Sequence, residues 1–288
     1  MLIFAQISDF HISLPEGRAE RTFQTAAHLR VAVAHLNALP QPPEFVLCTG
    51  DLVDGGGPGE YAILAEILSG LAMPYFLIPG NHDDRDAMRQ AFPGHGYLAG
   101  HDGFMQYTIE DWEPRLIGLD TLIPGASGGR LCPTRLAWLR TRLAEQPHRP
   151  TVLFMHHPPF RSGHLMMDKM GLEDCAGFAA VVRPHGQVEA VLAGHLHRHI
   201  THRFAGTVAI TTPGPAHQIA LDLSGEERLS LIMEPPAGLL HLWLGGDDGL
   251  VSHVTYTGGC YDRFEVFANG DWTGEDNPPA PSIPLQGA

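Results

Sequence analysis

Five short groups of residues in the chain combine carboxylate, imidazole and amide side chains. Each group directly follows a run of mainly apolar residues, where neither a strand nor the turn after it needs such side chains in order to fold. Asp, His and Asn supply oxygen and nitrogen ligands, which suit Mn, Fe, Co or Zn better than they suit Ca or a structural zinc site. The groups are Asp9-Phe10-His11, Gly50-Asp51, Gly80-Asn81-His82-Asp83, His156-His157 and Gly194-His195-Leu196-His197.

The apolar runs before these groups are typical of buried β-strands. They cover residues 2–8, 45–49, 75–78, 151–155 and 188–193. In open α/β sheets, ligand sites lie at the carboxyl ends of the strands. Because all five runs end in potential ligands, the sequence predicts one convergent metal site.

The candidate ligands are more numerous than one ion requires. They suffice for two adjacent ions if one carboxylate bridges them, and two ions about 3.5–4 Å apart can hold a hydroxide and clamp an in-line displacement at phosphorus. Metal binding lowers the pKa of water to as little as about 7, so no serine or cysteine nucleophile is needed. The seven candidates are Asp9, His11, Asp51, Asn81, His156, His195 and His197.

Helical patterns separate the predicted strands in the first two-thirds of the chain. Apolar residues recur at helical spacing over 18–39, 60–71, 133–143 and 174–183, so βαβ units and a largely parallel sheet are expected. Beyond residue 200, short apolar runs at 207–212, 218–223, 229–233, 239–244 and 250–256 predict antiparallel β-structure. We therefore expect a catalytic domain over 1–200, a β-rich part over 201–268 that completes the fold or forms a cap or dimerisation element, and a loosely ordered tail over 269–288.

The composition excludes several classes of protein. A formal charge of −14 over 288 residues argues against a nucleic-acid polymer or an anionic membrane as partner. The four cysteines, Cys48, Cys132, Cys175 and Cys260, have no metal-ligand spacing. No apolar run approaches the roughly 20 residues of a membrane span, and no signal peptide is evident, so a cytoplasmic protein is expected. A homodimer or higher homo-oligomer is possible.

In their order along the chain, the motifs DxH, GD, GNHD, H and GHxH resemble those of the calcineurin-like metallophosphoesterases. The resemblance runs from Asp9 to His197. It implies a four-layer α/β/β/α sandwich with a β-rich C-terminal extension or small cap, and two divalent transition-metal ions (Mn, Fe, Zn or Co). By this resemblance one ion is held by Asp9, His11, Asp51 and His197, and the other by Asp51 as the bridge, Asn81, His156 and His195.

The resemblance also suggests residues that act on the substrate. His82 would contact the phosphate and assist the leaving group rather than bind a metal. Asp54, three residues after the bridging aspartate, occupies the position of an acid that often pairs with this histidine in the family, although a plain turn aspartate is the alternative. Asn81 is a further candidate for substrate binding. So is His217, for which solvent exposure is the alternative.

Further segments are similar to class III cyclic-nucleotide phosphodiesterases and bacterial glycerophosphodiesterases. We therefore predict a binuclear metal-dependent phosphodiesterase that cleaves small phosphodiesters, with 3′,5′-cyclic nucleotides favoured, by in-line attack of a metal-bridging hydroxide. The alternatives are a glycerophosphodiesterase, a broad phosphomono- and diesterase and, against the complete ligand set, a metal-free scaffold. The segments lie at residues 118–121, 156–159, 167–172, 214–218 and 234–236.

Overall fold

The strands that precede the five motifs lie in two sheets of a computed structural model that describes residues 1–257, 267–268 and 271–272. In the first sheet the order is β15-β14-β1-β2-β3. β1, β2 and β3 run parallel to one another, while β14 pairs antiparallel with β1 and β15 antiparallel with β14. The bounds are β1 Leu2–Ile7, β2 Val46–Cys48, β3 Tyr75–Leu77, β14 Ala237–Gly245 and β15 Gly249–Tyr256.

The second sheet has the order β10-β11-β9-β7-β5-β4. Its centre is parallel, as predicted, and β4 and β10 pair antiparallel at its two edges. β11 pairs antiparallel with β10, as its sequence run predicted, and on its other side it runs parallel to β9, because the β10–β11 hairpin inserts β11 beside β9. The bounds are β4 Tyr107–Ile109, β5 Arg115–Leu119, β7 Thr151–Met155, β9 Val188–Ala193, β10 Ile200–Phe204 and β11 Thr207–Thr211.

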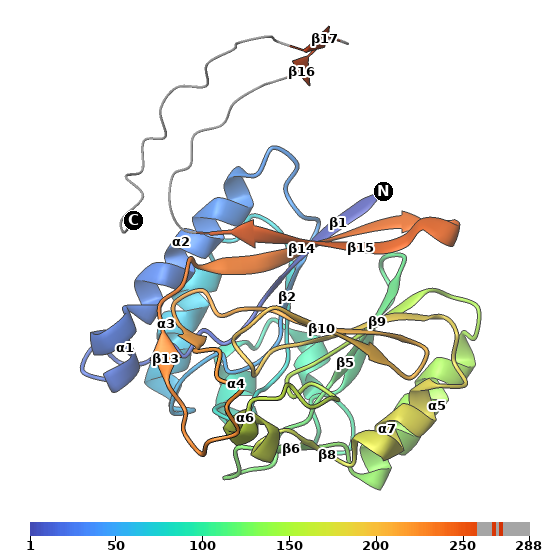
Figure 1. The fold of residues 1–288 in the computed structure, drawn as a ribbon, viewed down its shortest axis with the longest axis horizontal. Coiled ribbons are helices and arrows are strands. Elements are labelled where there is room, and N and C mark those ends of the chain that lie inside the picture. Colours follow the sequence, from blue (N-terminus) through green and yellow to red (C-terminus); the bar gives the residue numbers. More distant parts are fainter. Residues whose placement is uncertain (258–266, 269–270, 273–288) are drawn as a thin grey trace.

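Helices cover the outer face of each sheet (Figure 1). Those beside the first sheet are α2 Thr25–Ala38, α3 Pro58–Leu68 and α4 Arg85–Ala91, and those beside the second are α5 Pro133–Glu145 and α7 Cys175–Val182. Alternate residues of a strand point to opposite faces, and β1 follows this rule. Phe4 packs between the sheets, whereas Ala5 and Ile7 pack against the helices. The predicted four-layer α/β/β/α sandwich is therefore confirmed.

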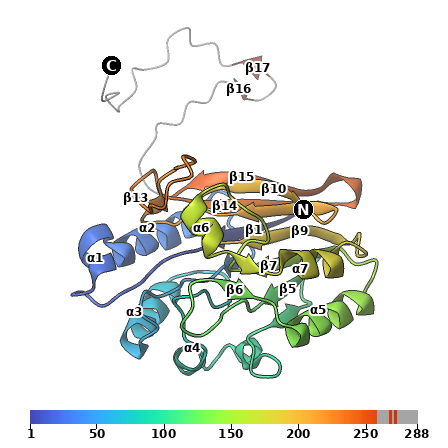
Figure 2. The same ribbon diagram turned by 60° about the horizontal axis from the view of Figure 1, so that its bottom comes forward.

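The helix predicted over residues 18–39 is interrupted. It forms α1 (Arg18–Phe23) and α2, separated by Gln24 in a left-handed conformation with φ of 52°. Glu20 stabilises this break, because its carboxylate accepts hydrogen bonds from the Thr25 hydroxyl (3.0 Å) and the Ala26 amide (2.9 Å) at the start of α2. In Figures 1 and 2, α1 extends from the N-terminal end of α2.

The remaining elements are short. They are α6 Leu165–Lys169, the 3-10 helices Gly96–Ala99 and Gly246–Asp248, and the pairs β6 Gly129–Arg130 with β8 Leu172–Glu173, β12 Gln218–Ile219 with β13 Leu231–Ile232, and β16 Phe267–Ala268 with β17 Asp271–Trp272. Among the described residues, no helix has the length and hydropathy needed to cross a membrane. Most of the predicted tail over 269–288, like Cys260, lies outside the described residues, and the division of the chain near residue 200 stays a prediction.

The turn that carries Asp51 can be tested through stability. Gly50 has φ of +93°, and a Cβ there would lie 2.6 Å from Nδ1 of His156 and 2.8 Å from the amide nitrogen of Gly80. We expect Gly50→Ala to lower the free energy of unfolding by about 1–3 kcal/mol in urea denaturation. The matched control is Gly186→Ala, where a Cβ meets nothing within 4 Å, and its effect should stay within about 0.5 kcal/mol. Equal effects of the two substitutions would contradict the strained packing of this turn.

Candidate metal centre

Most of the predicted ligands have an unusual backbone conformation. A positive φ is uncommon for residues other than glycine and costs free energy that the surroundings must offset. Residues in this conformation cluster at functional sites, so their concentration here marks the strand ends as a site. The five ligands and their φ values are Asp9 (57°), His11 (47°), Asp51 (48°), His195 (68°) and His197 (48°).

The first group of ligands lies between the ends of β1 and β9. Nε2 of His11 is 3.1 Å from Nε2 of His197, and the latter nitrogen is 3.5 Å from Oδ1 of Asp9. Nε2 of His11 is also 3.7 Å from Oδ2 of Asp51. Two ring nitrogens that face each other at this distance suit two ligands about 2.1 Å from a shared ion.

The second group lies between the ends of β2, β3, β7 and β9. Oδ1 of Asn81 is 3.2 Å from Nε2 of His156 and 3.1 Å from Nδ1 of His195. Nε2 of His156 is 3.3 Å from Oδ2 of Asp51, the same oxygen that approaches His11. The structure thus brings all seven predicted ligands together, with Asp51 between the two groups.

Three of the histidines are held in the orientation that a metal ligand needs. Their Nδ1 atoms face oxygen acceptors: the Asp54 carboxylate for His11 (3.3 Å), the Thr49 carbonyl for His156 (2.8 Å) and the His217 carbonyl for His197 (3.0 Å). A donating Nδ1–H leaves the lone pair on Nε2, which faces the other ligands in each case. The donor set therefore fits metal ions.

The charges of the cluster also fit a cation. Burial raises the pKa of the Asp9 carboxyl above its usual value, and the nearby His197 and His156 only partly oppose this effect. Burial also lowers the pKa of His195 to about 3 and lowers that of His197, so both rings are neutral, as ligation requires. Burial alone would lower the pKa of His156, but the Asp51 carboxylate raises it to about 9. A cation between these groups would compensate the buried carboxylates in place of that proton.

Asp83 holds two of the ligand-bearing turns together. Its buried carboxylate accepts hydrogen bonds from the backbone amides of Gly80 (2.8 Å) and Leu52 (3.1 Å) and from the Tyr61 hydroxyl (2.9 Å). The turn after β2 and the turn after β3 are therefore fixed to each other through one side chain. Asp83 orients Asp51 and Asn81 and is itself directed away from the cluster.

His82 interacts with the backbone of Asp54 more closely than with its carboxylate, which the sequence did not suggest. Nδ1 of His82 is 2.7 Å from the backbone carbonyl oxygen of Asp54 but 3.8 Å from its carboxylate. The carboxylate lies nearer to His11. Burial lowers the pKa of His82. The Asp51 carboxylate, the backbone carbonyl of Asp54 and the Asp54 carboxylate outweigh this effect, so the pKa of the ring lies above its ordinary value. The backbone of Asp54, rather than its carboxylate, orients His82.

His157 and His217 flank the ligand cluster. His157 is buried, and its ring nitrogens face the Thr121 hydroxyl (2.8 Å) and the Ser127 carbonyl (3.2 Å), so both are already engaged. His217 is only 4% exposed, so the alternative that this histidine is exposed to solvent is wrong. Its ring stacks on that of Phe23, with 4.3 Å between the ring centroids. Its Nδ1 has no hydrogen-bond partner among the residues that the structure describes, which leaves it available to a ligand.

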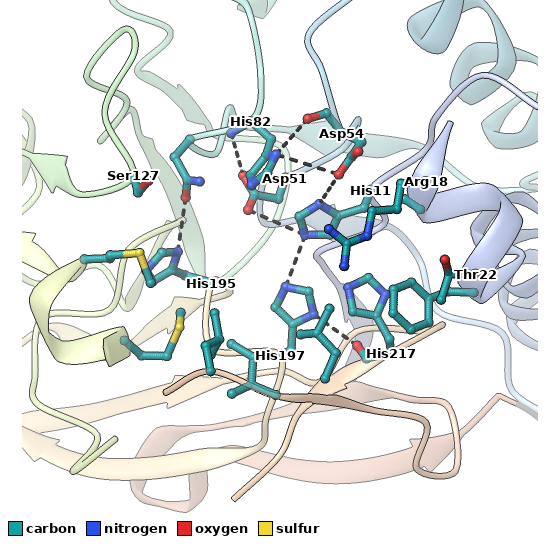
Figure 3. A pocket seen from close by; sticks show the side chains of 18 residues that line it. His11, Arg18, Thr22, Asp51, Asp54, His82, Ser127, His195, His197 and His217 are labelled. Carbon is teal, nitrogen blue, oxygen red and sulfur yellow. Dashed lines mark hydrogen bonds and ion pairs between the residues drawn. The ribbon is translucent and has the colours of Figure 1, made fainter. Parts of the chain in front are cut away.

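A pocket of about 470 Å³ opens over the cluster (Figure 3). His82, Asp54, Asn81 and His217 all line it, together with four other metal-ligand candidates. Its remaining walls come from α1, α6, the β12–β13 region and the loop before β6. The sequence had singled out segments 167–172 and 214–218, which overlap α6 and the start of β12, whereas α1, the loop before β6 and β13 carried no recognisable motif. The residues of these walls are Arg18, Ala19, Thr22, Phe23, Ser127, Met167, Met170, Ile219, Leu229 and Leu231.

The chain is similar to known proteins over most of its length. It matches the profile of calcineurin-like phosphoesterases over residues 2–199. It is 34% identical over 258 residues to a probable glycerophosphodiester phosphodiesterase of Arcobacter nitrofigilis. This match covers 89% of this chain and 94% of that protein. It is 38% identical over 237 residues to a probable cyclic nucleotide phosphodiesterase of Rhodopseudomonas palustris, which covers 81% and 85%. A dimetal phosphatase from Danio rerio shares the fold, with a TM-score of 0.61, 16% identity, and coverage of 89% of this chain and 99% of that one.

The link that Asp83 makes between the turns after β2 and β3 can be tested through stability. Asp83→Ala leaves buried backbone amides without an acceptor, and we expect it to lower the free energy of unfolding by about 3 kcal/mol or more. Tyr61→Phe removes one donor to the same carboxylate and the acceptor of the Asp84 amide, and it should cost about 1–2 kcal/mol. Urea denaturation of both variants measures the difference. A smaller effect for Asp83→Ala than for Tyr61→Phe would show that the carboxylate does not hold the two turns.

Proposed function

The chain belongs to the calcineurin-like phosphoesterase family, and we propose that it hydrolyses small phosphodiesters, with 3′,5′-cyclic nucleotides favoured. Its relatives within the family are named as phosphodiesterases, which implies a metal-dependent phosphoric diester hydrolase. The main support for this proposal is the position of Asp51. Its Oδ2 lies 3.7 Å from Nε2 of His11 and 3.3 Å from Nε2 of His156. Two ligand groups that meet at one carboxylate suit a pair of ions.

In this proposal both ions are divalent transition metals, drawn from Mn, Fe, Zn and Co. When bound, such ions lower the pKa of water and stabilise the charge of an in-line displacement at phosphorus. Asp51 is common to the two sites, so its loss would affect both. One site consists of Asp9, His11, Asp51 and His197, and the other of Asp51, Asn81, His156 and His195.

His82 is proposed as the residue that assists the leaving group. The Asp54 carbonyl holds its Nδ1–H at 2.7 Å, and its Nε2 makes no hydrogen bond within the described part of the chain. The neighbouring carboxylate and carbonyl oxygens favour its protonated form, which a general acid requires. Asp54 acts here as a positioning residue for His82 and His11, and Asn81 and His217 are further proposed substrate contacts.

The second candidate substrates are glycerophosphodiesters. The relative from Arcobacter nitrofigilis carries that activity in its name and is similar to this chain over 89% of its length. The relative from Rhodopseudomonas palustris, with higher identity over a shorter match, is named for cyclic nucleotides. The apolar side chains in the outer part of the pocket favour a substrate with a large organic ring over glycerol, because burying apolar surface stabilises the complex. These side chains are Ala19, Phe23, Met167, Met170, Ile219, Leu229 and Leu231.

A substrate panel tests the proposed function. After reconstitution with Mn, kcat/KM is measured for cyclic AMP, glycerophosphoglycerol and bis-p-nitrophenyl phosphate. We expect cyclic AMP to exceed glycerophosphoglycerol by at least about tenfold, which corresponds to roughly 1.4 kcal/mol of additional contact with the apolar wall. A higher value for glycerophosphoglycerol would favour the second candidate. Absence of turnover on all three esters, with metal bound, would reject the proposed activity.

The role of His82 can be separated from phosphate binding by the choice of leaving group. A ribose alkoxide needs a proton when it departs, whereas p-nitrophenolate does not. We expect His82→Ala to lower kcat by about 10²–10⁴-fold on cyclic AMP and far less on bis-p-nitrophenyl phosphate. His101→Ala, at a half-exposed histidine outside this pocket, is the control and should change neither rate. Equal losses on both esters would mean that His82 only binds the phosphate.

A further inference from the structure

Arg18, the first residue of α1, gives the outer part of the pocket a cationic side chain. Among the described residues that line the pocket, it is the only Lys or Arg. It is exposed, and within the described residues no carboxylate forms an ion pair with it. Figure 3 shows its side chain on the same side of the pocket as His11 and His217.

Arg18 belongs to α1, a short helix that hydrogen bonds fix to its neighbours. The amide of Glu20 donates to the Ser13 hydroxyl (3.0 Å), and the Glu20 carboxylate is bound to the start of α2. Ser13 follows the ligand His11 by two residues. The short helix is therefore fixed relative to the metal centre, and Arg18 keeps its place above it.

Within the described lining, no unengaged carboxylate is present to compensate a cation beside Arg18. The carboxylates of this lining are those of Asp51 and Asp54, and both are engaged with histidines. An aromatic face can also bind an ammonium group. Phe23 is the only Phe, Tyr or Trp among the described lining residues, and one of its faces is covered by the His217 ring at 4.3 Å and 20°.

The remaining surface of the outer pocket is mainly apolar. Its thioether and aliphatic side chains offer contact to a ring or an alkyl group but no acceptor to a charged one. A cation placed there would lose hydration without replacement and would be repelled by Arg18. The side chains are those of Met167, Met170, Ile219, Leu229 and Leu231.

We propose that Arg18 is a specificity-determining residue that excludes phosphodiesters with a positively charged alcohol and admits those with neutral or anionic organic groups. The proposal rests on the phosphodiesterase function proposed above. It places choline and ethanolamine esters outside the substrate class and cyclic nucleotides inside it. Glycerophosphodiesters would then be divided by the charge of their second alcohol.

The test compares two chromogenic esters with the same leaving group, ethyl p-nitrophenyl phosphate and choline p-nitrophenyl phosphate. Repulsion between two unit charges at contact distance in water corresponds to about fivefold in kcat/KM. We expect the metal-loaded enzyme to prefer the ethyl ester by at least about this factor. Arg18→Gln should reduce the preference to what the apolar wall alone imposes, and Arg18→Glu should reverse it. Because the ratio is taken within one variant, losses of folding or metal affect both esters equally.

Arg21 provides the matched control, since it lies on the same helix and outside the pocket lining. Arg21→Gln and Arg21→Glu should keep the wild-type ratio. Calorimetric titration of ethyl phosphate and phosphocholine gives a readout independent of turnover, with the same order expected. Equal rates on both esters, or a preference that Arg18→Glu leaves unchanged, would overturn the role of Arg18. Failure of the enzyme to cleave either ester would reject the proposed function and this inference with it.

Discussion

The contacts of the Asp51 carboxylate determine how the whole site is arranged. One of its oxygens accepts a hydrogen bond from the His82 amide (2.9 Å), and the other lies 3.3 Å from His156 and 3.7 Å from His11. These partners come from both sheets, so a single side chain relates the ends of β1, β2, β3 and β7. Carboxylates and imidazoles that are buried at such distances lose their hydration, and a cation held between them would compensate the buried negative charge. The same constraint explains why five ligands tolerate a left-handed backbone conformation.

The cluster of metal-ligand candidates was predictable from the sequence, because each candidate directly follows a recognisable strand. A strand that ends in Asp, His or Asn places that residue at the carboxyl edge of a sheet, whichever residues lie between the strands. Asp51 and Asn81 are therefore brought together by topology alone. The roles of the neighbouring residues were harder to predict. The backbone carbonyl of Asp54 orients His82, and a carbonyl contact leaves no trace in residue identity.

The parts that the sequence did not predict depend on contacts between distant segments. The break between α1 and α2 follows from the Glu20 carboxylate and the left-handed Gln24, which a helical spacing of apolar residues does not reveal. β11 inserts beside β9 because of the hairpin with β10, a strand that no apolar run had indicated. The outer part of the pocket is built from α1, α6 and the β12–β13 region, and α1 and β13 have no motif. Relatives named for different substrates are similar to this chain over most of its length, so we expect the selection of a substrate to depend mainly on these walls.

Anomalous X-ray diffraction from crystals grown with Mn can show whether two ions share Asp51. We expect two anomalous peaks about 3.5–4 Å apart with the Asp51 carboxylate between them. One peak should contact Asp9, His11 and His197, and the other Asn81, His156 and His195. A single peak at full metal occupancy, or two peaks of which only one contacts Asp51, would show that Asp51 does not bridge two ions.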